Sequence, residues 1–401
     1  MRIIIDARTT QDEIKFNGVG RYSNRIITSL IKEYPTTEFV LMMYDAPSTL
    51  DEFLKGGRLN VRIHKIGKYL NGRGFDLFLH NMDIGLQVRM SVEILKIKKR
   101  GDIFFCPYFM RGIPSFFIPT YITIHDFALV ELNSYSTISP VHNFLRWFYY
   151  WWQMFPIYFS KGVLCDSKYT LDHFEKYLPL YNKKKVYEVL LGTDFIEKET
   201  NISNYFEDKS YRKNYFVYLG GGITKNKNSE GVVKAYAEFV KTLGMKGEKK
   251  IPSLVIAGKN FTDMNVKEVK ALHQLAKDLG VYNRIIFTGK YDDLNIYSLL
   301  NNAIASIHLS ILEGFGFSVV EGMRAKSPVI VHNGSCYPEV VKNGGILVNG
   351  LDAKEVAAAM YKVYSDKEYA KAIAQKGYQV SLLYDWKKTA NQTFSVLSSE
   401  V

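Results

Sequence analysis

Short apolar runs alternate with segments of helical periodicity along the whole chain, and this alternation constrains the fold more than any other feature. Each run is bounded by Gly, Pro or Asp, which is typical of buried parallel strands joined by covering helices. The runs predicted as strands are Arg2–Asp6, Phe39–Tyr44, Val61–Ile66, Ile103–Cys106, Tyr121–Ile124 and Gly162–Cys165, followed by Tyr215–Leu219, Ser253–Ala257, Ile285–Thr288, Ala303–Ile307 and Pro328–Val331. The pattern therefore predicts an α/β protein that contains two sheets of similar size.

A polar stretch with few large aliphatic residues, Glu197–Asn214, separates the two series and is interpreted as a linker. A chain of 401 residues is also too long for one ordinary core. We expect a first domain over residues 1–200, a second over 201–380 and a terminal segment over 381–401. Helices are predicted over Tyr169–Tyr177 (with an N-cap from Asp166-Ser167), Ser229–Leu243 and Val266–Leu279.

The net charge of +12 predicts a surface that favours anions, but nucleic acid, acidic lipid and phosphorylated small molecules all satisfy it. Cys106, Cys165 and Cys336 form no Cys-x-x-Cys pair and are interpreted as reduced structural thiols of a cytosolic protein. The apolar run at the amino terminus is too short for a signal peptide and is predicted to be a strand. These features favour a cytoplasmic location.

An aromatic segment, Phe144–Phe159, leaves two interpretations open. It is shorter than the ~20 residues of a spanning helix and it contains Arg146. Its Trp and Tyr residues are typical of a membrane–water interface, and a helix packed on the first sheet would have the same composition. We therefore expect either a core helix or peripheral contact with an anionic membrane and a lipid-linked acceptor.

The strongest candidate for a ligand site follows the run Ala303–Ile307 and reads Glu313-Gly314-Phe315-Gly316-Phe317-Ser318-Val319-Val320-Glu321. Glycines in a strand-to-helix turn let the backbone approach a ligand, and N–H groups at a helix start stabilise a diphosphate. The carboxylates of Glu313 and Glu321 can accept hydrogen bonds from the hydroxyls of a sugar and a ribose. From these residues alone, a helix-capping glutamate and a surface glutamate explain the pattern equally well.

The order of motifs resembles family 4 of the retaining glycosyltransferases of GT-B fold. That family carries two glutamates separated by seven residues, which correspond here to Glu313 and Glu321. The stretches that match the family's neighbouring motifs are Leu254–Gly258, Ile286–Gly289, Pro328–Ile330, Gly334–Val340 and Gly344–Val348. The resemblance implies two facing Rossmann-like domains with a cleft between them. It also implies that a closing helix around Tyr384–Ala390 crosses back onto the first domain.

The first half and the phosphate-binding region match the family less closely. Asn17–Tyr22 resembles its glycine loop, and His125-Asp126 resembles its His-Asp pair at a strand end, where ligands of α/β folds gather. Lys227 aligns with the family's lysine, whereas Asn226 stands at the arginine position beside Lys225. A lysine lacks the bidentate fork of arginine, so the role of Lys225 is an open question.

The resemblance assigns roles to these residues. The chain has no Asp-x-Asp element, so neither a metal nor a separate cofactor is expected, and protein cations would neutralise the departing diphosphate. The acceptor would then attack from the same face, with retention. The expected catalytic residues are Glu313, Lys227 and His125, and the expected donor-binding residues are Glu321, Lys225, Gly18, Gly20, Gly314, Phe315, Gly316, Phe317 and Ser318.

The implied activity is transfer of a hexosyl group, with mannose or rhamnose favoured, from a GDP-, UDP- or dTDP-sugar to a glycan or lipid-linked glycan of a bacterial surface polysaccharide. A sucrose- or trehalose-type synthase has the same fold and is the alternative. A two-carboxylate glycosidase would need neither Lys227 nor the glycine loop. A nicotinamide enzyme would need a third glycine where Ser23 stands. A nucleic-acid-binding protein would interleave basic residues with exposed aromatic ones, whereas the aromatic cluster Phe144–Phe159 has only Arg146 among its rings.

Overall fold

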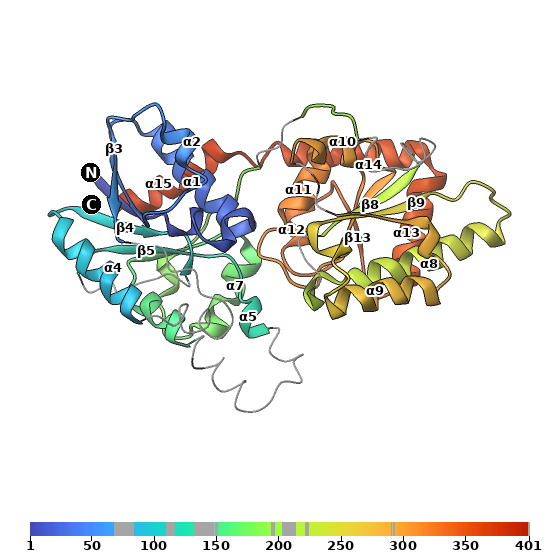
Figure 1. Ribbon diagram of the computed structural model, residues 1–401, viewed down its shortest axis with the longest axis horizontal. Coiled ribbons are helices and arrows are strands. Elements are labelled where there is room, and N and C mark those ends of the chain that lie inside the picture. The colour runs from blue at the N-terminus through green and yellow to red at the C-terminus, as the bar shows by residue number, and fades with distance from the viewer. Residues whose placement is uncertain are drawn as a thin grey trace. The chain divides into compact units, whose positions relative to one another are not determined.

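A computed structural model describes residues 1–67, 84–109, 117–131, 148, 151–193, 197–202, 214–220, 224–289, 291 and 293–399. The chain divides into two compact units (Figure 1). Unit 1 comprises Met1–Gly192 together with Asp385–Val401, and unit 2 comprises Thr193–Tyr384. The division falls between Gly192 and Thr193, whereas the sequence analysis placed it at residue 200. Each unit is described below by itself.

Unit 1 is built on a seven-stranded parallel sheet with the order β3-β2-β1-β4-β5-β6-β7. Strands β1, β4, β5 and β6 are buried along their whole length, which explains their continuous apolar sequences. The chain order reverses between β1 and β4, so loops from both halves of the sheet meet at one edge. The bounds are β1 (Arg2–Asp6), β2 (Glu38–Met43), β3 (Val61–Lys65), β4 (Asp102–Cys106), β5 (Thr120–Ile124), β6 (Gly162–Cys165) and β7 (Val186–Glu188).

One face of this sheet is covered by α4, η5 and α7, because Ile94, Ile157 and Phe174 from these elements join Phe104 and Ile122 of the sheet in one buried cluster. Helix α15 packs instead against α1, where the rings of Tyr34 and Phe394 stack with centroids 3.5 Å apart. The predicted return of the terminal helix to the first domain is therefore confirmed. The helical elements are η1 (Arg8–Thr10), η2 (Glu13–Phe16), α1 (Gly18–Glu33), α2 (Asp51–Leu54), α4 (Ile84–Ile97), α5 (Ala128–Glu131), η5 (Phe155–Phe159), α7 (Lys168–Tyr177), η6 (Lys183–Lys185) and α15 (Trp386–Ser398).

The predicted glycine loop is not a loop. Gly18 is the first residue of α1, and Gly20 lies in the first turn of that helix. A Cβ atom at Gly20 would lie 2.4 Å from the carbonyl oxygen of Ile14 in η2. The second glycine is therefore required because η2 crosses closely over the start of α1, and this packing explains it without a ligand.

The aromatic segment meets the core on one side and solvent on the other. Residues 144–147, 149 and 150 lie outside the described residues. In the described part, Met154 and Ile157 are buried in the core, whereas Trp151, Phe155 and Phe159 are exposed. The core interpretation is thus correct for one face of the segment only.

Unit 2 contains a six-stranded parallel sheet with the order β10-β9-β8-β11-β12-β13. The chain order reverses between β8 and β11, which places the segments after these two strands next to each other at the carboxyl edge of the sheet. The bounds are β8 (Tyr215–Leu219), β9 (Ser253–Ala257), β10 (Ile285–Gly289), β11 (Ala305–His308), β12 (Val329–His332) and β13 (Ile346–Val348).

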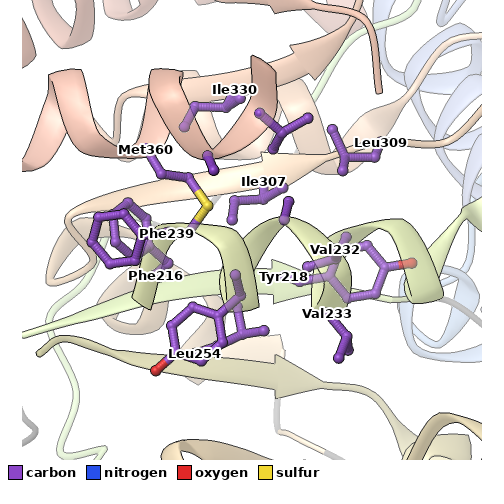
Figure 2. Close-up of a cluster of buried hydrophobic side chains, with 14 of the residues drawn as sticks. Phe216, Tyr218, Val232, Val233, Phe239, Leu254, Ile307, Leu309, Ile330 and Met360 are labelled. Atoms are coloured by element: carbon purple, nitrogen blue, oxygen red, sulfur yellow. The ribbon is translucent and has the colours of Figure 1, made fainter. Parts of the chain in front are cut away.

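Helices α8 and α13 lie side by side on one face of this sheet. Figure 2 shows Phe216 and Ile307 of the strands against Phe239 of α8 and Met360 of α13. The helical elements of unit 2 are η9 (Lys225–Lys227), α8 (Ser229–Met245), η10 (Lys259–Thr262), α9 (Lys267–Asp278), η11 (Tyr282–Arg284), η12 (Asp293–Asn295), α10 (Ile296–Asn301), α11 (Phe317–Arg324), α12 (Tyr337–Val341), α13 (Ala353–Ser365) and α14 (Lys367–Ser381).

The described part of the predicted linker belongs to unit 2. The backbone N–H of Thr200 donates to Ser298 Oγ of α10 at 2.7 Å, and Glu197 lies 3.9 Å from the guanidinium of Arg324. Residues 203–213 of the predicted linker lie outside the described residues. The segment 197–202 is therefore docked on the second unit, which polar composition alone could not reveal.

Candidate donor site

Two loops at the carboxyl edge of the unit 2 sheet bring the main candidate residues together. Residues 224–228 come after β8, and the segment 309–316 follows the adjacent strand β11. Asn226 joins them, because its carbonyl oxygen accepts from Ile311 N at 2.7 Å and its Nδ2 donates to the Leu312 carbonyl at 3.3 Å. The side chain at the family's arginine position thus holds the two loops together.

This connection places the ammonium group of Lys227 against the carboxylate of Glu313, and the lysine Nζ donates to Glu313 Oε1. The side chains are 27% and 20% exposed, so each is partly shielded from water and still open on one side. The hydroxyl of Tyr218 donates to the Lys227 carbonyl at 3.1 Å. A cation and an anion are therefore held at fixed positions on one open edge.

Ser335 fixes the backbone of Glu313 from the opposite direction. The hydroxyl of Ser335 accepts from Glu313 N at 2.9 Å and donates to the Glu313 carbonyl at 2.6 Å. Ser335 itself has a left-handed backbone, with φ of 55°. From the sequence, Ser335 was noted only as part of a matching stretch, because its contact with Glu313 depends on the approach of two loops that are distant in the chain.

The start of α11 is suited to an anion. Its N-cap residue is Gly316, with φ of 83°, and this residue has no side chain to cap the first N–H groups of the helix. A Cβ atom at Gly316 would lie 2.6 Å from Cε1 of Tyr337. The glycine is thus required by its backbone conformation and by the close tyrosine ring, and it brings no capping side chain to the helix start, where an anion is stabilised.

Ser318 in the first turn of α11 is linked to a buried histidine that the sequence analysis missed. His308 Nδ1 lies 3.3 Å from Ser318 Oγ, and His308 Nε2 lies 3.1 Å from Ser306 Oγ. Burial lowers the pKa of His308 to about 3, so the ring is neutral at ordinary pH. An uncharged imidazole therefore orients the Ser318 hydroxyl. The position of His308 at the end of β11 was the one sequence signal that could have identified this histidine as part of the site.

The other predicted donor residues occupy different environments. Glu321 is only 3% exposed within α11, so it is not the surface glutamate of the alternative interpretation. Gly314 is buried, and the buried ring of Phe315 packs on Tyr384 with centroids 5.4 Å apart. Phe317 and Ser318 are half-buried, whereas Lys225 is exposed on η9. Lys227, Glu313 and the start of α11 thus form the polar centre of the site.

In unit 1, His125 joins the carboxyl ends of three neighbouring strands. It follows β5, its Nδ1 lies 2.9 Å from Asp166 Oδ2 after β6, and its Nε2 lies 3.0 Å from the Pro107 carbonyl oxygen after β4. The ring of Tyr22 packs edge-on against the imidazole at 4.7 Å. Both ring nitrogens of His125 are therefore engaged by protein oxygens.

The electrostatics of this pair favour a shared proton. Burial lowers the pKa of His125, but the hydrogen bond and charge of Asp166 outweigh it and raise that pKa above its ordinary value. Burial raises the pKa of Asp166 to about 6, against the opposing effect of His125. Asp166 Oδ1 is buried and has no hydrogen-bond partner among the described residues. A proton between the two side chains therefore avoids a bare buried charge.

In the described part of the chain, no cluster of three or more His, Cys, Asp or Glu side chains is arranged to hold a metal ion. None of the described helices is both long and apolar enough to cross a membrane. The three cysteines are buried and unbonded to one another.

Each of the two α/β units is built on a parallel sheet. In unit 2, the switch point after β8 brings together a lysine, a glutamate and a helix that begins after a glycine. This is the architecture of GT-B glycosyltransferases. Residues 202–380 match the family model described as glycosyl transferases group 1. The family resemblance in the sequence is therefore confirmed for residues 202–380, which are similar to the glycosyl transferases of group 1.

Several known proteins are similar to this chain. The O-antigen chain mannosyltransferase RfbU of Salmonella typhimurium is 25% identical over 205 residues, which is 51% of each chain. The alpha-1,3/1,6-mannosyltransferase ALG2 of Dictyostelium discoideum is 26% identical over 235 residues, 54% of this chain and 56% of that protein. The chain thus matches about half the length of these relatives. The crystal structure of Anabaena Alr3699/HepE with UDP and glucose covers 100% of both chains at 19% identity, with a TM-score of 0.69, and shows the shared fold.

Proposed function

We propose that this protein is a retaining glycosyltransferase that transfers a hexosyl group from a nucleoside diphosphate sugar without a metal ion. The observation that carries the proposal is the Lys227–Glu313 pair beside the uncapped start of α11. A cation and the amides at a helix start complement a diphosphate, and an adjacent carboxylate complements sugar hydroxyls. Mannose is the favoured sugar because the relatives RfbU and ALG2 are mannosyltransferases by name.

The charge of the leaving group decides the roles of the unit 2 residues. As the bond between the anomeric carbon and the phosphate oxygen breaks, negative charge grows on the diphosphate. Lys227 and the N–H groups of Phe317 and Ser318 would stabilise this charge, because preorganised donors are most effective where charge develops. Glu313 would accept hydrogen bonds from the donor sugar, and Glu321 from the ribose. Exposed Lys225 would add a second cation near the phosphates.

Retention follows if the acceptor hydroxyl attacks the anomeric carbon from the face that the diphosphate leaves. The new bond joins the acceptor oxygen to the anomeric carbon, and the hydroxyl proton passes to a phosphate oxygen of the leaving diphosphate. The protein then needs no general base of its own. This suits the paired state of Glu313, whose carboxylate already accepts from Lys227.

For unit 1 we assign His125 a positioning role in place of the expected catalytic one. Its two ring nitrogens bind Asp166 and the Pro107 carbonyl, so the side chain holds the ends of β4, β5 and β6 in register. We propose that this carboxyl edge contacts the acceptor, a glycan or a lipid-linked glycan. His125 would then influence the apparent affinity for the acceptor more than the rate of bond breaking.

Calorimetric titration of the protein with UDP, GDP and dTDP, each with EDTA present, tests donor recognition. We expect one nucleotide to bind clearly more tightly than the others, and Lys227→Ala to weaken that binding by about tenfold from loss of a charged contact. Short single- and double-stranded DNA provides the comparison for a nucleic-acid-binding protein. Binding of DNA with no binding of any nucleoside diphosphate would refute the proposal.

A further inference from the structure

A basic hollow lies at the amino edge of the unit 1 sheet, opposite the edge that holds His125. It has a volume of ≈ 560 Å³, and its lining includes Lys98, Lys99, Arg100, Phe117 and Lys161. The first three residues precede β4, Phe117 precedes β5 and Lys161 precedes β6. The starts of three neighbouring parallel strands therefore bring four cationic residues to one place.

The acidic residue in the lining does not cancel this charge. Asp102 is buried and accepts from Arg2 Nε at 3.0 Å and from Lys99 N at 2.6 Å. Its carboxylate is thus already neutralised by Arg2. The Lys98 ammonium donates to the Phe117 carbonyl at 2.9 Å, which holds one cation at the rim of the hollow. The lining therefore carries an excess of positive charge that a phosphate group complements.

Exposed aromatic side chains lie at the hollow itself and on the short helix that precedes Lys161. Phe117 at the hollow is 46% exposed, and Phe155 and Phe159 of η5 are 48% and 41% exposed. The rings of Phe155 and Phe159 contact each other edge-on at 5.0 Å, and η5 leads through Ser160 directly to Lys161. Ile157, on the other side of η5, is buried in the core, so the aromatic pair is presented on a rigid element.

A surface that enters a membrane interface typically combines apolar rings with neighbouring lysine and arginine side chains. The ends of the core elements present this combination here. We propose that this amino-edge surface, defined by Lys98, Lys99, Arg100, Phe117, Phe155 and Lys161, docks on an anionic lipid bilayer. The hollow receives the phosphate of one lipid head group, and the phenylalanine rings enter the interface. The inference does not depend on the proposed donor chemistry in unit 2.

Co-sedimentation with phosphatidylcholine vesicles, with and without phosphatidylglycerol, tests the proposal. The wild type is expected to bind the vesicles that contain phosphatidylglycerol and to be released by high salt. The double variant Lys98→Gln/Lys161→Gln is expected to bind these vesicles at least about tenfold more weakly, since each cation near an anionic surface contributes about a fivefold effect. Phe155→Ser/Phe159→Ser should also weaken binding and leave its salt dependence unchanged.

The matched control is Lys249→Gln/Lys250→Gln, which removes the same charge from exposed positions in unit 2. Equal loss of binding in this control would show that net charge alone attracts the protein, and would overturn the proposal. Binding of inorganic phosphate but of no vesicles would overturn it too, because the hollow would then be a site for soluble anions. Unfolding midpoints and nucleotide binding, measured on the same samples, separate these outcomes from misfolding and from failure of the donor proposal.

Discussion

His125 Nδ1 lies 2.9 Å from Asp166 Oδ2, so two titratable side chains that follow adjacent strands share a buried hydrogen bond. The carboxylate raises the pKa of the histidine against the effect of burial. Without Asp166, only the charge of Asp126 and the Pro107 carbonyl would oppose the effect of burial on the pKa of the ring. We therefore expect Asp166→Asn to lower the pKa of His125, measured by NMR titration of the imidazole. Asp172→Asn, at an exposed position on α7, is the control and should leave that pKa unchanged. An equal pKa in Asp166→Asn and wild type would contradict the shared-proton account.

The Lys227–Glu313 pair gives the second prediction. Lys227→Ala and Glu313→Ala should each reduce turnover by at least about tenfold, because each removes a charged contact to the donor. Their effect on the free energy of unfolding should be small, about 0–1 kcal/mol, since both side chains are partly exposed. Turnover and urea unfolding are measured on the same preparations. Lys234→Ala, which breaks the exposed ion pair with Glu230 on α8, is the control and should change neither.

Gly316 gives the third prediction. Gly316→Ala forces an L-residue into a left-handed conformation and places a methyl group against Tyr337. We expect a loss of about 1–3 kcal/mol in the free energy of unfolding and weaker nucleotide binding, since the start of α11 must shift. Gly244→Ala, on α8 with open space around its Cβ position, should instead be neutral or slightly stabilising. Unfolding curves that show equal effects for both variants would argue against a strained helix start.

His308 predicts a specific dependence of stability on pH. Its folded pKa of about 3 lies below its unfolded value near 6.5, so the unfolded chain binds a proton first as the pH falls. The contribution of His308 to stability is therefore complete above pH 6.5 and is lost progressively toward pH 3. By about pH 5 this loss amounts to roughly 2 kcal/mol.

His308→Gln removes this titration. Urea unfolding of the wild type and of the variant is compared at about pH 7 and about pH 5, and the stability of the wild type should fall more steeply with acid. Parallel pH profiles for the two proteins would show that His308 is not held neutral in the folded state. Ser318 would then not be oriented by an uncharged ring.

The sequence predicted the strands well because the central strands of both sheets are buried on both faces. Tyr215–Leu219 and Ser253–Ala257, for example, agree at both ends with β8 and β9. Strands β7 and β13 were missed, since each has three residues and is partly exposed at a sheet edge. Buried parallel strands thus have a strong local signal, whereas short edge strands depend on their neighbours.

The sequence could predict those site residues that directly follow a strand, because the end of a parallel strand places them at the carboxyl edge of the sheet. Lys227 and Glu313 each follow a strand next to the switch point, and they meet there as an ion pair. Ser335 and His308 were not predicted as parts of the site, because their roles arise from contacts between loops and between a strand and a helix. The predicted contact of Gly20 with the donor stays a prediction, because a close crossing of η2 and α1 demands the same residue as a ligand-binding loop.

Activation of a nucleotide sugar by unit 2, through Lys227 and without a metal, is central to the proposed function. Acceptor-free turnover of a panel of nucleotide sugars, with excess EDTA, tests this directly through release of nucleoside diphosphate and the anomer of the freed sugar. We predict slow hydrolysis of one donor to the retained anomer, reduced at least about tenfold in Lys227→Ala. Release of the inverted anomer, or full release by Lys227→Ala, would contradict the account.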